Sequence, residues 1–69
     1  MKPVSGYAFA RAVERRGWTL LRVNGSHHIY GKPGESARLS IPCHGGRLLK
    51  AGLQRHLMKI AGLTDAELD

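Results

Sequence analysis

The chain has 69 residues, enough for one small domain with a thin hydrophobic core but too few for a large enclosed active site. Its formal net charge is +6, and residues 1–63 carry all eleven Lys and Arg against only two acids, so eleven minus two gives that part a charge of +9. Such a surface attracts polyanions, and RNA or DNA is the expected class of partner, although an acidic protein would also fit.

The cysteine content and the hydropathy pattern indicate where in the cell the protein is expected. Cys43 is the only cysteine, which excludes an internal disulfide and fits a reducing cytoplasm. The N-terminal residues have no apolar run after their lysine, and no stretch approaches the ~20 apolar residues of a membrane span. We therefore expect a cytoplasmic protein without a secretion signal or membrane anchor.

The first predicted element is a helix that begins after Ser5, a favourable N-cap, and runs to about Arg16. Its apolar residues recur at helical spacing, whereas Arg11 and Arg15 share another face. Gly17 follows as a C-terminal stop.

Three strands are predicted next. Residues 18–23 are rich in strand formers, and Asn24-Gly25 predicts a tight hairpin turn because both residue types tolerate positive φ. Residues 26–30 form the return strand. Residues 37–41 alternate between apolar and polar side chains, which predicts a half-buried third strand, and Pro42 ends it.

A second helix is predicted from about Leu48 to Ala61, after the flexible connection 44–46. Its apolar stripe comprises Leu49, Leu53, Leu57 and Ile60. Residues 64–67 then resemble a capping box that begins a last short turn.

The order of these elements predicts an α+β fold, α-β-β-β-α, that forms a single domain over residues 1–69. Two helices packed on one face of a three-stranded antiparallel sheet would bury both apolar stripes at once. This is the layout of the double-stranded-RNA-binding domain, although a fold alone does not define a function.

Two adjacent histidines, His27 and His28, follow the predicted turn. Neighbouring strand residues point to opposite faces, so His27 should share a face with Ile29, and His28 with Tyr30. Imidazole takes and gives protons near neutral pH, and RNA cleavage needs a base for the 2′-hydroxyl and an acid for the leaving 5′-oxygen. An isolated His-His pair is nevertheless more often an ordinary polar part of a hairpin.

The chain resembles the HicA family of messenger-RNA interferases, which is also known through YcfA-like proteins. The residues that carry this resemblance are Gly17-Trp18, the segment 25–30, Ile41-Pro42 with His44, and the closing helix with Leu63. The resemblance implies a double-stranded-RNA-binding-like fold, cleavage of messenger RNA and neutralisation by a HicB-type antitoxin that covers the catalytic histidine. It places that histidine at His27, with His28 as second choice because some members have a lone histidine one position later.

Three further residues are predicted to support His27. Gly25 matches the family's glycine before the histidine, where it would close the turn and leave the backbone bare, and turn formation alone explains it equally well. Ser26 could bind phosphate or cap the turn, and the second role is more common. His44 is either the acid partner of His27 or an ordinary loop histidine.

The predicted RNA contacts come from cations and one aromatic ring. They are Arg11, Arg15, Lys50, Arg55 and Lys59, each of which is also explained as a solvated surface charge, and Tyr30, which would stack on a base if Ile29 faced the helices.

A metal site is not predicted. In the pairs His27-His28 and Cys43-His44, adjacent side chains point to opposite sides, and magnesium would find almost no oxygen ligands. We expect metal-independent RNA cleavage without a cofactor. The alternatives are a non-catalytic RNA-binding module of the same fold and an inactive family member that only binds a protein.

Overall fold

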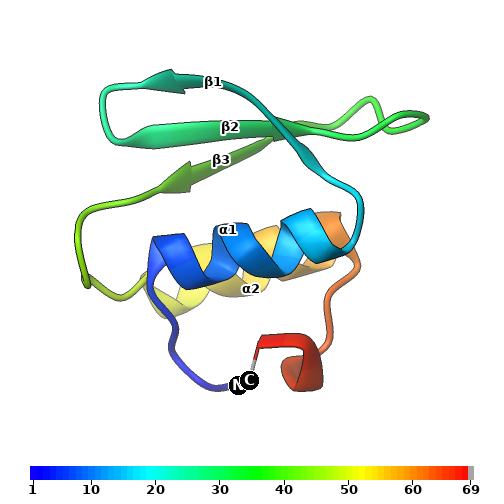
Figure 1. The fold of residues 1–69 in the computed structure, drawn as a ribbon. Coiled ribbons are helices and arrows are strands. Elements are labelled where there is room, and N and C mark those ends of the chain that lie inside the picture. The colour runs from blue at the N-terminus through cyan, green and yellow to red at the C-terminus, as the bar shows by residue number, and fades with distance from the viewer. Residues whose placement is uncertain (69) are drawn as a thin grey trace.

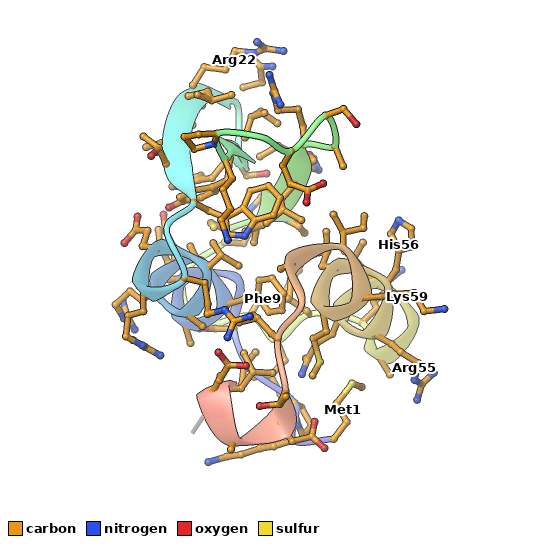
Figure 2. The ribbon with its side chains drawn as sticks, turned by 90° about the vertical axis from the view of Figure 1, so that its right-hand side faces the viewer. Met1, Phe9, Arg22, Arg55, His56 and Lys59 are labelled. Carbon is orange, nitrogen blue, oxygen red and sulfur yellow. The ribbon has the colours of Figure 1, made fainter. Side chains whose placement is uncertain are left out.

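The structure of the protein is a computed structural model, and it describes residues 1–68. The elements are α1 (Gly6–Arg15), β1 (Thr19–Asn24), β2 (His27–Gly31), β3 (Leu39–Pro42), α2 (Ala51–Ala61) and the short 3-10 helix η1 (Asp65–Leu68). The three strands form one antiparallel sheet in the order β1-β2-β3. This arrangement confirms the predicted α+β fold with the order α-β-β-β-α. Both helices lie side by side under one face of the sheet, and η1 lies below them (Figures 1 and 2).

Helix α1 begins and ends where its sequence predicts. The hydroxyl of Ser5 accepts a hydrogen bond from the backbone N–H of Ala8 at 3.1 Å, which is the expected N-cap. Gly17 follows the helix with a φ of +94°. The apolar face is buried, and Phe9, with no exposed surface, lies between the two helices (Figure 2).

The first turn of α1 packs directly on the end of β3. A Cβ atom added to Gly6 would lie 1.9 Å from the carbonyl oxygen of Pro42. Only a glycine permits this separation, and the contact fixes α1 against the strand that leads to the loop 43–50.

The hairpin between β1 and β2 is confirmed, with its loop one residue later than expected. Asn24 pairs with His27, so the two loop residues are Gly25 and Ser26. Gly25 has a φ of +59°, whereas Asn24 has a negative φ. Positive φ at the first loop position alone is the pattern of a type II′ turn. The third strand is also shifted, because it starts at Leu39 and includes Pro42.

The side chains of β2 alternate between the two faces as predicted. Tyr30 pairs with Leu39 and His28 with Ile41, and Leu39 and Ile41 have no exposed surface beneath the sheet. His27 therefore lies on the opposite face, paired with Pro42.

Helix α2 starts at Ala51, so the prediction that it starts at Leu48 is wrong. Leu48 forms an isolated antiparallel bridge with Ser5, and the N–H of Leu49 donates to the carbonyl of Val4 at 2.9 Å. These bonds to the N-terminal segment hold the backbone extended where the apolar spacing favours a helix. Leu49 is buried all the same, but it reaches the core from outside the helix.

Gln54 is a buried polar residue of α2 that the helical pattern did not indicate. Its side chain has no exposed surface. The carbonyl oxygen Oε1 accepts a hydrogen bond from the N–H of Val4 at 3.2 Å, and Nε2 donates to the carbonyl of Lys2 at 2.7 Å. Gln54 thereby joins the N-terminal segment to α2.

The C-terminal turn is anchored to the end of α1. The carboxylate of Glu67 accepts a hydrogen bond from the N–H of Thr64 at 2.8 Å, which confirms the capping contact predicted there. The other carboxylate oxygen accepts from the guanidinium of Arg16 at 2.9 Å. Over residues 1–68, no helix is long and apolar enough to cross a membrane.

Candidate active site

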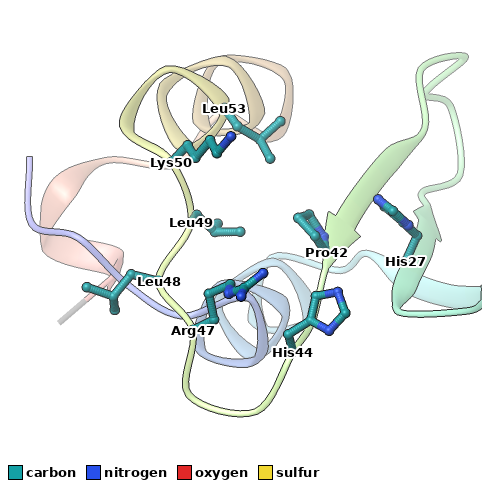
Figure 3. A pocket seen from close by; sticks show the side chains of 8 residues that line it. All are labelled: His27, Pro42, His44, Arg47, Leu48, Leu49, Lys50 and Leu53. Atoms are coloured by element: carbon teal, nitrogen blue, oxygen red, sulfur yellow. The ribbon is translucent and has the colours of Figure 1, made fainter.

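A pocket of about 350 Å³ lies where the sheet ends and α2 begins (Figure 3). Its lining consists of four apolar residues and four that carry an imidazole or a cation: Pro42, Leu48, Leu49 and Leu53, and His27, His44, Arg47 and Lys50. The pocket is open to solvent, as expected for so small a chain. None of these eight lining residues is acidic.

The hairpin places His27 at the rim of this pocket. His27 is the first residue of β2, directly after the loop Gly25-Ser26, and its side chain is exposed. A Cβ atom added to Gly25 would meet nothing within 4 Å, so the glycine serves the positive φ of the turn rather than a close approach of another group.

A backbone hydrogen bond brings the second histidine to the same pocket. The N–H of Cys43 donates to the carbonyl of Ser26 at 2.8 Å. Since Ser26 directly precedes His27 and Cys43 directly precedes His44, this bond fixes the two histidine-bearing backbones beside each other. The pocket thus brings together His27 and His44, which the sequence could only offer as a hypothetical pair.

Arg47 is a pocket residue that the sequence analysis missed. The N–H of Arg47 donates to the carbonyl of His44 at 2.9 Å, which closes a turn through Gly45 and Gly46. Figure 3 shows Arg47 and His44 next to each other on one side of the pocket. The available signal was a cation three residues after a histidine, across a Gly-Gly pair that favours a tight turn.

His28 and Tyr30 lie on the helix-facing side of the sheet, outside the pocket. His28 is half-buried, and its ring forms a T-shaped pair with the ring of Tyr7, with centroids 5.4 Å apart. Tyr30 is only 2% exposed, and its hydroxyl donates to the carboxylate of Glu14 at 2.6 Å. Burial, together with Glu14, raises the pKa of Tyr30 far above its usual value. The expectation that Tyr30 stacks on a base required Ile29 to face the helices; because Tyr30 faces them instead, its ring is not available.

The five predicted RNA-contacting cations lie in four different places. Lys50 lines the pocket with His27, whereas Arg55 and Lys59 border a shallow hollow on the outer surface of α2 together with His56 (Figure 2). Arg11 is exposed on α1.

Arg15 lies at the other end of α1 from the pocket. It is nine residues, or about 13 Å of helix, beyond the contact of Gly6 with β3. Its guanidinium donates to the carbonyl of Glu67 at 3.2 Å. The structure therefore associates Arg15 with the C-terminal turn.

Within residues 1–68, no three His, Cys, Asp or Glu side chains gather as metal ligands would. Cys43 is buried, and its thiol donates to the carbonyl of Ile41 at 3.5 Å. Burial raises the pKa of this thiol, which keeps it protonated. Cys43 therefore fills space in the core.

An open, cationic pocket with two imidazoles has the groups that can bind a phosphodiester and transfer protons to and from it. A model of the family described as HicA toxin of bacterial toxin-antitoxin matches residues 7–63, which include every residue that lines the pocket. The chain belongs to the HicA toxin family. It is therefore classed with the toxins of toxin–antitoxin systems, whose partners are antitoxins. No curated protein matches the sequence.

Proposed function

We propose that the protein is the toxin of a type II toxin–antitoxin system, and that it is an endoribonuclease that cleaves messenger RNA with His27. One observation carries this proposal: His27, His44, Arg47 and Lys50 line a single open pocket in a chain of the HicA toxin family. An exposed imidazole beside a second imidazole and two cations supplies each group that transesterification of RNA requires.

In the proposed reaction, His27 is the general base. It removes the proton of the ribose 2′-hydroxyl, and the 2′-oxygen forms a bond to phosphorus while the bond from phosphorus to the 5′-oxygen breaks. His44, in its protonated form, gives its proton to that leaving oxygen. Arg47 and Lys50 stabilise the negative charge that develops on the phosphoryl oxygens. The products are a 2′,3′-cyclic phosphate and a 5′-hydroxyl.

The proposed reaction uses no divalent metal. Two-metal hydrolysis requires carboxylates that hold the ions, and residues 1–63 contain only Glu14 and Glu35. Glu14 is hydrogen-bonded to Tyr30, and neither glutamate lines the pocket. DNA lacks the 2′-hydroxyl and should resist cleavage even where it binds the basic surface.

The proposed inhibitor is a HicB-type antitoxin with an acidic contact face that covers His27. The net charge of +9 on residues 1–63 supports this, because complementary charge accelerates encounter with an acidic partner. The pocket is open, so a partner that seats over its rim would bury the exposed side chain of His27 without a rearrangement of the core. RNA should be protected in the complex.

The decisive test uses purified protein, single-stranded RNA and excess chelator, followed by analysis of the fragment ends. We expect His27→Ala to lower the cleavage rate on the order of 100-fold or more while its circular dichroism and RNA binding stay unchanged. His28→Ala should cleave normally, although loss of its contact with Tyr7 should lower stability slightly. Expression of the wild-type chain without antitoxin should arrest growth, and His27→Ala should relieve the arrest.

Each alternative has its own result in this experiment. Full cleavage by folded His27→Ala, with loss in His28→Ala, would move the catalytic role to His28. Cleavage that requires magnesium and leaves 5′-phosphates would contradict the mechanism. A wild-type chain that binds RNA but never cuts it would identify a non-catalytic RNA-binding module.

A further inference from the structure

Half of the pocket lining is aliphatic, and the folding of the chain does not explain all of it. Leu49 is 7% exposed and belongs to the core, whereas Leu48 is 57% exposed. The backbone of Leu48 is nevertheless held in place by its bridge to Ser5. Its side chain is therefore presented to solvent at a fixed position, at an energetic cost that a bound apolar group would remove.

The neighbours of Leu48 extend this surface into the pocket. Leu53 is half-buried in the first turns of α2 and packs against the core, and Pro42 is half-buried at the end of β3. Figure 3 shows Leu53 on the α2 side of the pocket and His27 on the sheet side, with Arg47 beside His44. One pocket thus has an aliphatic part and, within the same volume, two imidazoles and two cations.

This combination restricts the chemistry of the ligand. The aliphatic part suits a flat or apolar group, and the cations Arg47 and Lys50 suit an anion attached to it. The volume of about 350 Å³ is at the small end of the range for ligand pockets. One nucleotide combines an apolar, flat base with a phosphate at this scale, so a single ligand would occupy the aliphatic part and pair with both cations.

We propose that the aliphatic part of the pocket, Leu48 and Leu53 with Pro42, is a base-binding subsite that takes one unstacked nucleotide of single-stranded RNA. The subsite rests on the proposed ribonuclease function and adds its substrate class. Arg47 and Lys50 bind the phosphate of that nucleotide, and the phosphate then lies toward His27 and His44. A base inside a duplex has both faces stacked, so it cannot present a face to Leu48.

The subsite would distinguish single-stranded from duplex RNA, which the positive charge of the protein does not. Electrostatic attraction acts on every phosphate, in single strands and duplexes alike. Contact of a base face with Leu48 and Leu53 requires that the nucleotide be unstacked first. We therefore expect cleavage of a single-stranded RNA and protection of the same sequence when it is annealed to its complement.

The first test measures binding without cleavage, by two-dimensional NMR titration of the full chain. The ligands are adenosine 3′-monophosphate, ribose 5-phosphate, which lacks the base, and adenosine, which lacks the phosphate. We expect the nucleotide to shift the amide signals of residues 44–53 and to bind about fivefold or more tightly than either fragment. Leu48→Ala should remove this advantage of the nucleotide over ribose 5-phosphate.

Leu21→Ala is the matched control. Leu21 is also an exposed leucine, at 50%, but it lies on β1 and outside this pocket. Both substitutions remove a solvent-exposed side chain, so both proteins should fold. In cleavage assays, Leu48→Ala should raise KM about fivefold or more while kcat stays within about twofold, and Leu21→Ala should change neither.

Three results would overturn the subsite. Ribose 5-phosphate could bind as tightly as the nucleotide, which would leave a phosphate site without a base subsite. Duplex RNA could be cleaved as fast as the single strand. Leu48→Ala could leave nucleotide binding and KM unchanged and weaken only the complex with the antitoxin, which would make Leu48 a protein contact. Because the titration needs no turnover, a chain that binds nucleotides here but cuts no RNA would contradict only the proposed ribonuclease function.

Discussion

Tyr30 is buried against the helices, so it stabilises the fold and is not available to bind RNA. Its hydroxyl donates to Glu14 at 2.6 Å, across the interface between β2 and α1. Tyr30→Phe keeps the ring and removes only this bond. We expect a loss of about 1–3 kcal/mol in the free energy of unfolding near pH 7, because the variant loses a hydrogen bond to a charged carboxylate. Urea denaturation of the two proteins measures the difference.

The raised pKa of Tyr30 adds a pH dependence to the same variant. The ordinary pKa, 10.0, applies to the unfolded chain, and burial beside Glu14 raises it in the folded protein. The stabilisation is therefore fully present below pH 10 and is lost as the pH rises above that value. The difference between wild type and Tyr30→Phe should shrink above pH 10. Tyr7→Phe, at an exposed position, should keep the wild-type alkaline decline.

At the residue scale, the sequence correctly predicted which side chains of β2 share a face of the sheet. His27 and His28 lie on opposite faces because neighbouring strand residues always do. Which of the two faces meets the helices depends on the packing of the whole sheet, so the availability of Tyr30 was not decided by the strand. Gln54 escaped prediction for a related reason, because its partners Lys2 and Val4 lie about fifty residues away.

At the scale of elements, the contact between α1 and β3 permits a sharp test with two glycines. A Cβ at Gly6 would lie 1.9 Å from the carbonyl oxygen of Pro42, so Gly6→Ala forces the helix away from the strand. We expect a loss of about 2–3 kcal/mol or more in the free energy of unfolding. A Cβ at Gly52 would meet nothing within 4 Å, and Gly52→Ala lies in α2. It should stabilise the protein by about 0.5–1 kcal/mol.

Guanidinium denaturation of both variants checks this pair. Equal effects of the two substitutions would show that α1 does not pack on β3 as closely as the structure has it. Gly52→Ala should unfold at a higher guanidinium concentration than the wild type. Because Pro42 also lines the pocket, Gly6→Ala should in addition reduce RNA cleavage.

The ends of elements were predicted well where local signals decide them and poorly elsewhere. Ser5 and Gly17 delimit α1 through a cap and a positive φ that each residue supplies by itself. The start of α2 depends instead on the bridge from Leu48 to Ser5, which no pattern within residues 44–61 contains. The same non-local pairing shapes the pocket, because it keeps the backbone of residues 47–50 extended, and these residues line the pocket together with the end of β3. The sequence placed the start of the helix at about Leu48, whereas the bridge holds this exposed residue outside the helix.

Over the whole molecule, the charges are divided between a basic body and an acidic end. The carboxylate of Glu67 accepts a hydrogen bond from Arg16, and its backbone carbonyl accepts one from Arg15. The guanidinium of Arg16 also donates to the carbonyl of Gly62. These arginines thus hold the C-terminal turn against α1. The cations of the pocket and of α2 are placed at other parts of the surface, where a polyanion has access to them.

This division predicts how RNA binding responds to salt. Each phosphate that a cation neutralises on a single strand contributes about −0.7 to the slope of log affinity against log salt concentration. We expect Arg47→Ala and Lys50→Ala each to reduce the magnitude of the slope by about that amount, because both residues line the pocket. Arg15→Ala removes the same charge at the C-terminal turn, so it should lower the melting temperature and leave the slope unchanged. Fluorescence anisotropy with a labelled single-stranded RNA, measured in folded His27→Ala to prevent cleavage, gives the three slopes. If Arg15→Ala changed the slope as much as Lys50→Ala, the RNA would follow α1, and the pocket would not be the principal phosphate site.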